Sequence, residues 1–291
     1  MKLATFTHGG ETRIGAVVGE LVVDLSKAAP ELPTNMRDFL VAGDPAMEMA
    51  REAQTASEHA LAVVDVELGA PIANPGKILA IGLNYADHIE ETGAETPKVQ
   101  MWFNKQITAT NGPYGDINKP SVSDLLDYEG ELVFVVGKRA KHVPRDRAHE
   151  VIAGYCCGND VSVRDWQRRS QTMQIGKSFD THAPFGPWIV TPDEAGDPHD
   201  LALRTYVNGE KRQDTNTQHM VFDCFDQIAH LTQAFTLEPG DVIYTGTSSG
   251  VAVAQNPPPW LVVGDLVRVE IENIGYIENN VVMESGDSIL E

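Results

Sequence analysis

The sequence has few basic residues. Its 291 residues include 22 lysines and arginines against 42 aspartates and glutamates, which gives a formal net charge of −20. This balance argues against nucleic-acid binding, because phosphate contacts require clusters of Lys and Arg that the chain does not display. It also repels anionic substrates at long range, so a site for an anion would need positive groups of its own.

Long apolar runs and cysteines are scarce as well. No apolar run approaches the roughly 18 residues that a membrane span requires, and the start MKLATFTHGGETRIG lacks the basic and apolar segments of a secretory signal. The three cysteines, Cys156, Cys157 and Cys224, are odd in number and lie in apolar surroundings, which favours reduced core thiols over a disulfide or a thiolate zinc site. We therefore expect a cytoplasmic protein without membrane contact. With 42% hydrophobic residues, the chain can bury a full core.

Two regions with different patterns follow one another along the chain, without internal repeats or low-complexity tracts. Residues 1–70 predict a small amino-terminal α/β module, with an Ala-rich helix over about Pro45–Val64 and short strands at Lys2–Thr7, Arg13–Val18 and Leu21–Leu25. The PIANPGK linker then leads into a catalytic domain over residues 75–288. Its strands are predicted at Leu132–Val136, Trp188–Thr191, Leu203–Val207, Val242–Thr245 and Leu266–Ile271, with a hairpin turn at Asn208–Gly209 and one helix over about Phe222–Phe235. This pattern indicates a mixed, β-rich α/β fold.

Two glutamates mark the segment DYEGELVFVVG. Glu129 and Glu131 stand two residues apart at the start of an apolar strand, so their carboxylates point to one face. Asp160 follows Glu131 by 160 − 131 = 29 residues, in CCGNDVSVRD. Three carboxylates suit a hard divalent cation such as Mg²⁺, Mn²⁺ or Ca²⁺ rather than Zn²⁺. The alternative is an exposed acidic strand edge, which is common in so acidic a chain.

Three further segments carry residues suited to catalysis. KILAIGLNYADHIEET predicts a strand, a turn at Gly82 and a helical turn in which His88 and Glu91 share a face, so that the carboxylate can orient the imidazole as a general base. Lys177, in the Gly- and Pro-containing GKSFDTHAPFGPW, can project into a cleft. The turn at Thr245–Thr247 offers N–H groups and a hydroxyl to an anionic oxygen. Taken alone, each has a plainer alternative, a solvated surface residue or an ordinary turn.

Six motifs in order resemble the fumarylacetoacetate hydrolase family, specifically its bacterial branch of acylpyruvate-type hydrolases and related lyases. They are GLNYADHIEE, WFNKQITATNGP, DYEGELVFVVG, GNDVSVRDWQ, GKSFDTHAPFGPW and EPGDVIYTGTSSGV. The match covers about residues 75–284, and so many ordered motifs make coincidence implausible. The resemblance implies a β-roll with the active site in its mouth, and a homodimer that pairs through the β-rich domains.

The resemblance also implies roles for individual residues. Ligands of Mg²⁺ or Mn²⁺ are matched by Glu129, Glu131 and Asp160. Catalytic groups are matched by His88 and Glu91, a water-activating dyad on a segment that is commonly a mobile lid, and by Lys177, which neutralises charge beside the metal. Substrate-binding positions are matched by Tyr85, Arg164, Gln167, Gly246 and Thr247, of which the threonine grips the substrate carboxylate. The chain departs from the family at Gln106 and Ser248, where proline is frequent, and at Ala252, where glycine is frequent.

The implied reaction is hydrolysis of a C–C bond in a 2,4-dioxo acid, such as an acylpyruvate or a 2,4-diketo-3-deoxy sugar acid. Water activated by His88 would attack C4, the C3–C4 bond would break, and the products would be a pyruvate-type 2-oxo acid and a carboxylic acid. Alternatives on the same metal–enolate platform are decarboxylation of oxaloacetate and isomerisation or lysis of a 2-oxo-alkenoate. The complete dyad favours hydrolysis. A non-catalytic binding protein is the alternative of another class, and retention of the three acids, the dyad and Lys177 argues against it.

Overall fold

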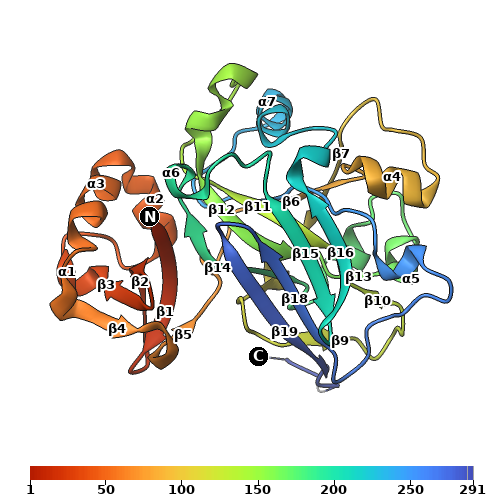
Figure 1. The fold of residues 1–291 in the computed structure, drawn as a ribbon, viewed down its shortest axis with the longest axis horizontal. Helices are drawn as coiled ribbons and strands as arrows, with labels where there is room; N and C mark the ends of the chain where they lie inside the picture. Colours follow the sequence, from red (N-terminus) through yellow and green to blue (C-terminus); the bar gives the residue numbers. More distant parts are fainter. Residues whose placement is uncertain (287, 291) are drawn as a thin grey trace.

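The protein is built from two large β-sheets and a small two-stranded sheet, with short helices around them (Figure 1). The computed structural model describes residues 1–286 and 288–290. No helix within these ranges is long and apolar enough to cross a membrane. The expected mixed, β-rich α/β class is confirmed.

The amino-terminal region contributes the first strands of the larger sheet. Its elements are β1 (Lys2–His8), β2 (Glu11–Val18), β3 (Leu21–Asp24), β4 (Ala60–Ala62), β5 (Glu67–Leu68), α1 (Leu25–Ala28), α2 (Met36–Ala42) and α3 (Asp44–Ala53). The three strands predicted for this region are confirmed as β1, β2 and β3. They form an antiparallel meander.

The predicted helix over Pro45–Val64 is wrong in its second half. Helix α3 ends at Ala53, and β4 begins at Ala60. The Thr55 hydroxyl and the Gln54 side-chain amide donate to carbonyl groups of the last helical turn, so these side chains compete with continuation of the helix. The following residues pair with β3 instead, because a strand partner decides between helix and strand where local propensity is weak.

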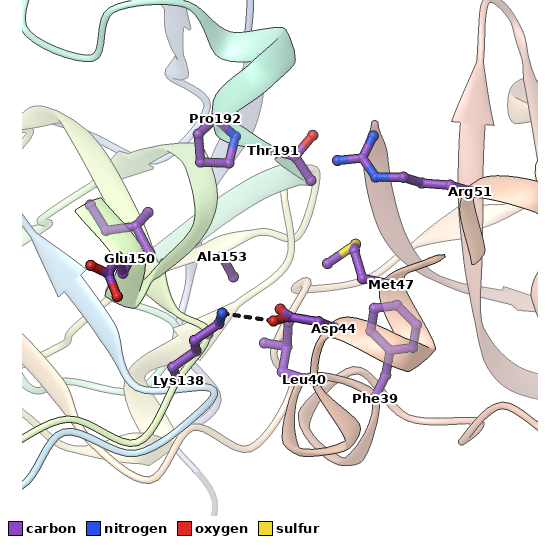
Figure 2. A pocket seen from close by; sticks show the side chains of 13 residues that line it. Phe39, Leu40, Asp44, Met47, Arg51, Lys138, Glu150, Ala153, Thr191 and Pro192 are labelled. Carbon is purple, nitrogen blue, oxygen red and sulfur yellow. Dashed lines mark hydrogen bonds and ion pairs between the residues drawn. The ribbon is translucent and has the colours of Figure 1, made fainter. Parts of the chain in front are cut away.

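The amino-terminal region and the rest of the chain share one sheet. Strand β1 pairs with β14 (Ala183–Val190), with Lys2 opposite Val190. A cavity of about 200 Å³ lies beside this junction, between α2 and α3 on one side and the start of β12 (Ile152–Asn159) on the other (Figure 2). The Lys138 ammonium bridges its rim to the Asp44 carboxylate at 2.9 Å. The division near residue 70 stays a prediction.

The centre of the larger sheet runs in the order β14, β12, β11, β17, β6 and β7. The strands not yet given are β6 (Ile78–Gly82), β7 (Met101–Lys105), β11 (Gly130–Val136) and β17 (Val242–Tyr244). All residues of β11 and β12 are buried. Because both faces of β11 are covered, its residues from Leu132 to Val136 are all apolar, which explains why this part of the strand shows no alternation in the sequence.

The second sheet has five strands and packs on one face of the first. Its order is β16 (Glu210–Asn216), β15 (Ala202–Val207), β18 (Leu266–Ile271), β19 (Gly275–Met283) and β9 (Ile117–Lys119). Leu132 and Phe134 of β11 lie in one apolar cluster with Leu203 and Val269 of this sheet. The hairpin turn between β15 and β16 is confirmed at Asn208–Gly209, where both residues have positive φ.

The remaining elements are short apart from one helix. They are α4 (Ala86–Thr92), α5 (Arg164–Gln167), α6 (Pro192–Ala195), α7 (Cys224–Ala234), β8 (Thr110–Asn111), β10 (Leu126–Asp127) and β13 (Ser162–Val163). The predicted helix over Phe222–Phe235 is confirmed as α7. Asp223 and Asp226 form a capping box at its amino-terminal end. All three cysteines are buried and form no disulfide.

Candidate active site

Strand pairing brings the three acidic side chains together. Glu131 lies on β11, and Glu129 lies just before it. The pairing of β11 with β12 places Gly130 opposite Asn159, and the Asp160 N–H donates to the Glu129 carbonyl at 2.8 Å. One carboxylate oxygen from each of Glu129, Glu131 and Asp160 lies within 4.8 Å of the others, and all three residues are buried. The exposed acidic edge is thereby excluded for this segment.

Gly130 permits this arrangement because the second sheet approaches it closely. A Cβ atom at this position would lie 2.0 Å from the Thr205 hydroxyl oxygen and 3.2 Å from the Gln213 side-chain oxygen. The Gly130 N–H donates to that Gln213 oxygen at 2.9 Å. The glycine between the two glutamates thus lets β15 and β16 contact the acidic cluster directly.

Three cationic side chains neutralise part of the cluster. Lys177 bonds to Glu129 and, at 2.7 Å, to Asp160. The Arg164 guanidinium donates to Glu129 at 2.7 Å. Lys105, which sequence reasoning missed, bonds to the second oxygen of Asp160. Its place in the family-like motif WFNKQITATNGP is the sequence signal that could have pointed to it.

These contacts shift the pKa values of the buried acids and lysines in different directions. Burial alone would raise the pKa of Glu129, but Arg164 and Lys177 hold it well below its usual range. Burial would also lower the pKa of Lys177, yet Asp160 and Glu129 outweigh it and raise that pKa, so Lys177 stays a cation. Burial lowers the pKa of Lys105, which Asp160 opposes only partly.

Glu131 differs from the other two acids. Its carboxylate accepts the Gly246 N–H at 2.7 Å, and within residues 1–286 and 288–290 no basic side chain pairs with it. Burial, Asp160 and Glu129 raise its pKa well above the usual range. An oxygen-rich set with one unpaired carboxylate fits a hard divalent cation. Glu129, Glu131 and Asp160 are therefore the residues that could hold one.

The charge count supports the same conclusion. Asp127 is the fourth buried acid, and it accepts from the Arg164 guanidinium at 2.8 Å. With Glu131 ionised, as metal binding requires, the cluster contains four carboxylates against the three cations Lys105, Arg164 and Lys177, a balance of 3 − 4 = −1. A bound divalent cation would change this balance to +1, which is the sign that an anionic substrate requires.

His88 and Glu91 lie as the helical spacing predicts. The His88 Nδ1 atom and a Glu91 carboxylate oxygen are 3.3 Å apart on α4. The other Glu91 oxygen accepts the Gly250 N–H at 2.9 Å. Because Glu91 is an acceptor, it favours a proton on Nδ1 and leaves Nε2 as the basic nitrogen. The dyad thus has the geometry of a general base, while its catalytic role stays a prediction.

Helix α4 is also joined to its surroundings through Asp87. The Asp87 carboxylate accepts from the Ser249 hydroxyl at 3.3 Å and from the Thr215 hydroxyl at 3.2 Å. His88 itself is only 8% exposed. The helix therefore lies closed against the loop that follows β17.

Four of the five predicted substrate-binding residues, Arg164, Gln167, Tyr85 and Gly246, have their main contacts within the protein. Arg164 contacts Gln167 at 3.0 Å as well as its two acidic partners, so its guanidinium mainly holds the acidic cluster together. Tyr85 is fully buried, and burial together with the charge of Glu131 raises its pKa. Gly246 has a φ of 95°, and a Cβ there would lie 2.7 Å from that of Asn84.

The Thr247 hydroxyl is the remaining predicted contact. It donates to the Gly130 carbonyl at 3.0 Å and accepts from Gln213 at 2.8 Å. Thr247 therefore adjoins the strand that carries Glu129 and Glu131. Asp127 and Gln213 are further site residues that sequence reasoning missed. Asp127 is recognisable only from its bonds to Arg164 and to the N–H groups of Ala252 and Val253, and Gln213 only from its bonds to Gly130 and Thr247.

Comparison with known proteins identifies the family. The family described as fumarylacetoacetate (FAA) hydrolase C-terminal matches residues 77–282. The mitochondrial oxaloacetate tautomerase fahd2 of Xenopus laevis is 43% identical over 97% of this chain and 90% of its own length.

Two solved structures extend the likeness to the fold. The fumarylacetoacetate hydrolase of psychrophilic Exiguobacterium antarcticum matches with a TM-score of 0.85 at 34% identity. The maleylpyruvate hydrolase of Sphingobium sp. SYK-6, in complex with manganese(II) and pyruvate, matches with a TM-score of 0.80 at 30% identity. Each alignment covers 98% of this chain and all of the other. The chain belongs to the fumarylacetoacetate hydrolase family, and the resemblance seen in its motifs is confirmed.

Proposed function

We propose that the protein is an enzyme that interconverts the enol and keto forms of oxaloacetate or a closely similar 2-oxo dicarboxylate, with Mg²⁺ or Mn²⁺ as cofactor. The observation that carries the proposal is a His88–Glu91 dyad near a buried cluster of three carboxylates and two lysines. Besides Arg164 and Lys177, the charge of His88 contributes to the lowered pKa of Glu129 in that cluster. The likeness to an oxaloacetate tautomerase over nearly the whole chain supports the same substrate class.

Electrostatics supports an anionic substrate. A divalent cation held by Glu129, Glu131 and Asp160 would supply positive charge that stabilises an enolate. Lys177 adds a permanent charge, because the carboxylates beside it raise its pKa. The site can therefore stabilise negative charge on the C2 oxygen in an otherwise acidic protein.

The chemical step is a proton transfer. Going from enol to keto, the O–H bond at C2 breaks, a C–H bond forms at C3, and the C2–C3 double bond becomes a C2–O double bond. Nε2 of His88 is the group that accepts and returns the proton, and Glu91 stabilises the imidazolium while it holds one. Lys177 is excluded as the base because it stays protonated.

Hydrolysis of a 2,4-dioxo acid is the second candidate. The solved maleylpyruvate hydrolase with manganese(II) and pyruvate favours it, and the same His88–Glu91 pair could activate water. The two reactions share the enolate and differ in what the histidine deprotonates. Oxaloacetate decarboxylation would use the same enolate without a base.

A substrate panel separates these activities. The purified protein is given enol-oxaloacetate, keto-oxaloacetate and several acylpyruvates, each with chelator, Mg²⁺ or Mn²⁺. Enol absorbance reports tautomerisation, and enzymatic detection of pyruvate reports cleavage. We expect metal-dependent loss of enol absorbance faster than any pyruvate release. Rapid pyruvate release from acylpyruvates with no effect on the oxaloacetate enol would replace the first candidate by the second, and absence of both activities would overturn the proposal.

We also propose a homodimer that associates through the second sheet. Arg268 and Tyr276 lie on its outer face, with the guanidinium 3.7 Å from the ring centroid, and aromatic residues and Arg are enriched at interfaces. The Tyr276 side chain is 37% exposed on this face. Light scattering at low and high protein concentration tests the assembly. A fully active particle with the mass of one chain would exclude it.

A further inference from the structure

Gln213 lies outside all six family-like motifs and still contacts two parts of the site. It belongs to β16 in the second sheet and is only 1% exposed. Its side-chain oxygen accepts the Gly130 N–H at 2.9 Å. Its nitrogen donates to the Thr247 hydroxyl at 2.8 Å and to the Ser248 carbonyl at 3.1 Å. One amide thus links the acidic strand to the loop after β17.

The partners fix which way the amide of Gln213 faces. The Gly130 N–H can only donate, and the Ser248 carbonyl can only accept. A flipped amide would place an NH₂ group against an N–H and an oxygen against a carbonyl, which costs two hydrogen bonds in a buried site. The Gln213 nitrogen therefore faces Thr247.

This orientation determines the polarity of the Thr247 hydroxyl. Because its oxygen already accepts from Gln213, its own hydrogen must point elsewhere. In the structure that hydrogen goes to the Gly130 carbonyl at 3.0 Å. The bond from Gln213 occupies one lone pair of the hydroxyl oxygen and directs the hydrogen away from β16. That hydrogen can turn from the Gly130 carbonyl to a carboxylate oxygen, which replaces one acceptor by a charged one.

We infer that Gln213 is a positioning residue that makes Thr247 a hydrogen-bond donor to the substrate carboxylate. The inference rests on the proposed function, in which the substrate is a 2-oxo acid, and on the family resemblance, which assigns the substrate carboxylate to Thr247. Selectivity for an anionic group over a neutral one then arises from the second sheet, through a residue that does not touch the substrate.

The close packing of β16 supports this role. A Cβ atom at Gly250, in the loop that contains Thr247, would lie 2.0 Å from the Arg212 carbonyl oxygen. The strand that carries Gln213 therefore touches the substrate-binding loop on both sides of Ser248. Little space is left for the amide of Gln213 to turn or for water to replace it.

A double-mutant cycle tests the inference. Pyruvate affinity is measured by calorimetry at saturating Mn²⁺ for the wild type, Gln213→Met, Thr247→Val and the double variant, with Thr247→Ser as matched control. Loss of a hydrogen bond to a charged group predicts about tenfold to a hundredfold weaker pyruvate binding in each single variant. If Gln213 acts through Thr247, the double variant should be no weaker than Thr247→Val, and Thr247→Ser should stay near the wild type.

Separate outcomes contradict the two proposals. Unchanged pyruvate affinity in Gln213→Met beside a weakened Thr247→Val would overturn the role of Gln213, and so would effects that multiply in the double variant. Unchanged affinity in Thr247→Val would instead overturn the carboxylate contact that the family resemblance assigns to Thr247. Affinity for Mn²⁺ alone, measured without pyruvate, should be the same in all variants.

A second variant covers the case in which Gln213→Met does not fold. Gln213→Glu keeps an acceptor for the Gly130 N–H but accepts from the Thr247 hydroxyl, so pyruvate binding should weaken. If the added charge alone caused this loss, it would recur in the Thr247→Val background. Weakening that is absent in that background supports the inference, and weakening of equal size in both backgrounds overturns it.

Discussion

Replacing Glu131 by glutamine should separate metal binding from folding. The amide can still accept the Gly246 N–H, but it removes the one carboxylate of the cluster that has no cationic partner in the described chain. Burial and the neighbouring carboxylates raise the pKa of Glu131. Without metal, the variant should therefore be at least as stable as the wild type, because it no longer contains a buried charge without a partner.

With metal bound, the wild type should instead be more stable than the Glu131→Gln variant. At a Mn²⁺ concentration about 100 times Kd, binding contributes about 2.7 kcal/mol to stability. A domain of this size gains roughly 2–4 °C in Tm per kcal/mol, so the wild type should gain about 5–11 °C. If loss of one ligand weakens Kd about a hundredfold, the same Mn²⁺ concentration contributes about 0.4 kcal/mol, or roughly 1 °C.

The pH dependence provides an independent check. In the metal-free wild type, the folded protein holds the Glu131 proton more tightly than the unfolded chain, so this contribution to stability is complete below the ordinary pKa of 4.5. It is lost as pH rises through the raised pKa. Metal binding must displace the same proton, so Mn²⁺ affinity should increase over that range and then level off.

Differential scanning calorimetry with chelator or Mn²⁺, between pH 5 and 8, measures both effects. Glu150→Gln is the matched control, because Glu150 lies on the surface beside Arg147, away from the cluster. Its Mn²⁺-induced shift should equal that of the wild type. A Glu131→Gln variant that gained as much Tm from Mn²⁺ as the wild type would refute the assignment of the cation to this cluster.

Three other substitutions test the rest of the site. His88→Ala should reduce tautomerisation and acylpyruvate cleavage by about 10²–10⁴-fold and spare most oxaloacetate decarboxylation, measured as carbon dioxide release; equal loss of all three would mean that His88 is not the base. Lys105→Met removes one buried cationic partner of Asp160 and should lower the free energy of unfolding in urea by about 3–5 kcal/mol. Lys138→Met removes an exposed partner of Asp44 and should lower it by about 0–1 kcal/mol. Similar losses in the two variants would contradict a stabilising role for the buried Lys105–Asp160 pair. Asp87→Asn weakens the contacts of α4 with Ser249 and Thr215 and should speed hydrogen exchange in that helix; unchanged exchange would show that these contacts do not hold α4 closed.

Local pattern decided the elements whose contacts are close in sequence. The β-branched and charged residues that alternate in Leu266–Ile271 predicted β18 with its observed bounds, and the Asn208–Gly209 pair predicted a turn, in which both residues have positive φ. The three-residue spacing of His88 and Glu91 likewise predicted their contact on α4. These features follow from the periods of the helix and strand and from the preference of Asn-Gly pairs for hairpin turns, all of which are local properties of the sequence.

Only strand pairing decided the rest of the site. Lys105 and Asp160 are 55 residues apart, and Gln213 and Gly130 are 83 apart. No local period relates such residues, because their contact depends on the register of β11 with β12 and on the packing of the second sheet against the first. The sequence by itself therefore determined which acids and bases the family-like motifs supply. The tertiary structure decided which cation meets which carboxylate, which leaves Glu131 as the acid without a basic partner among the described residues.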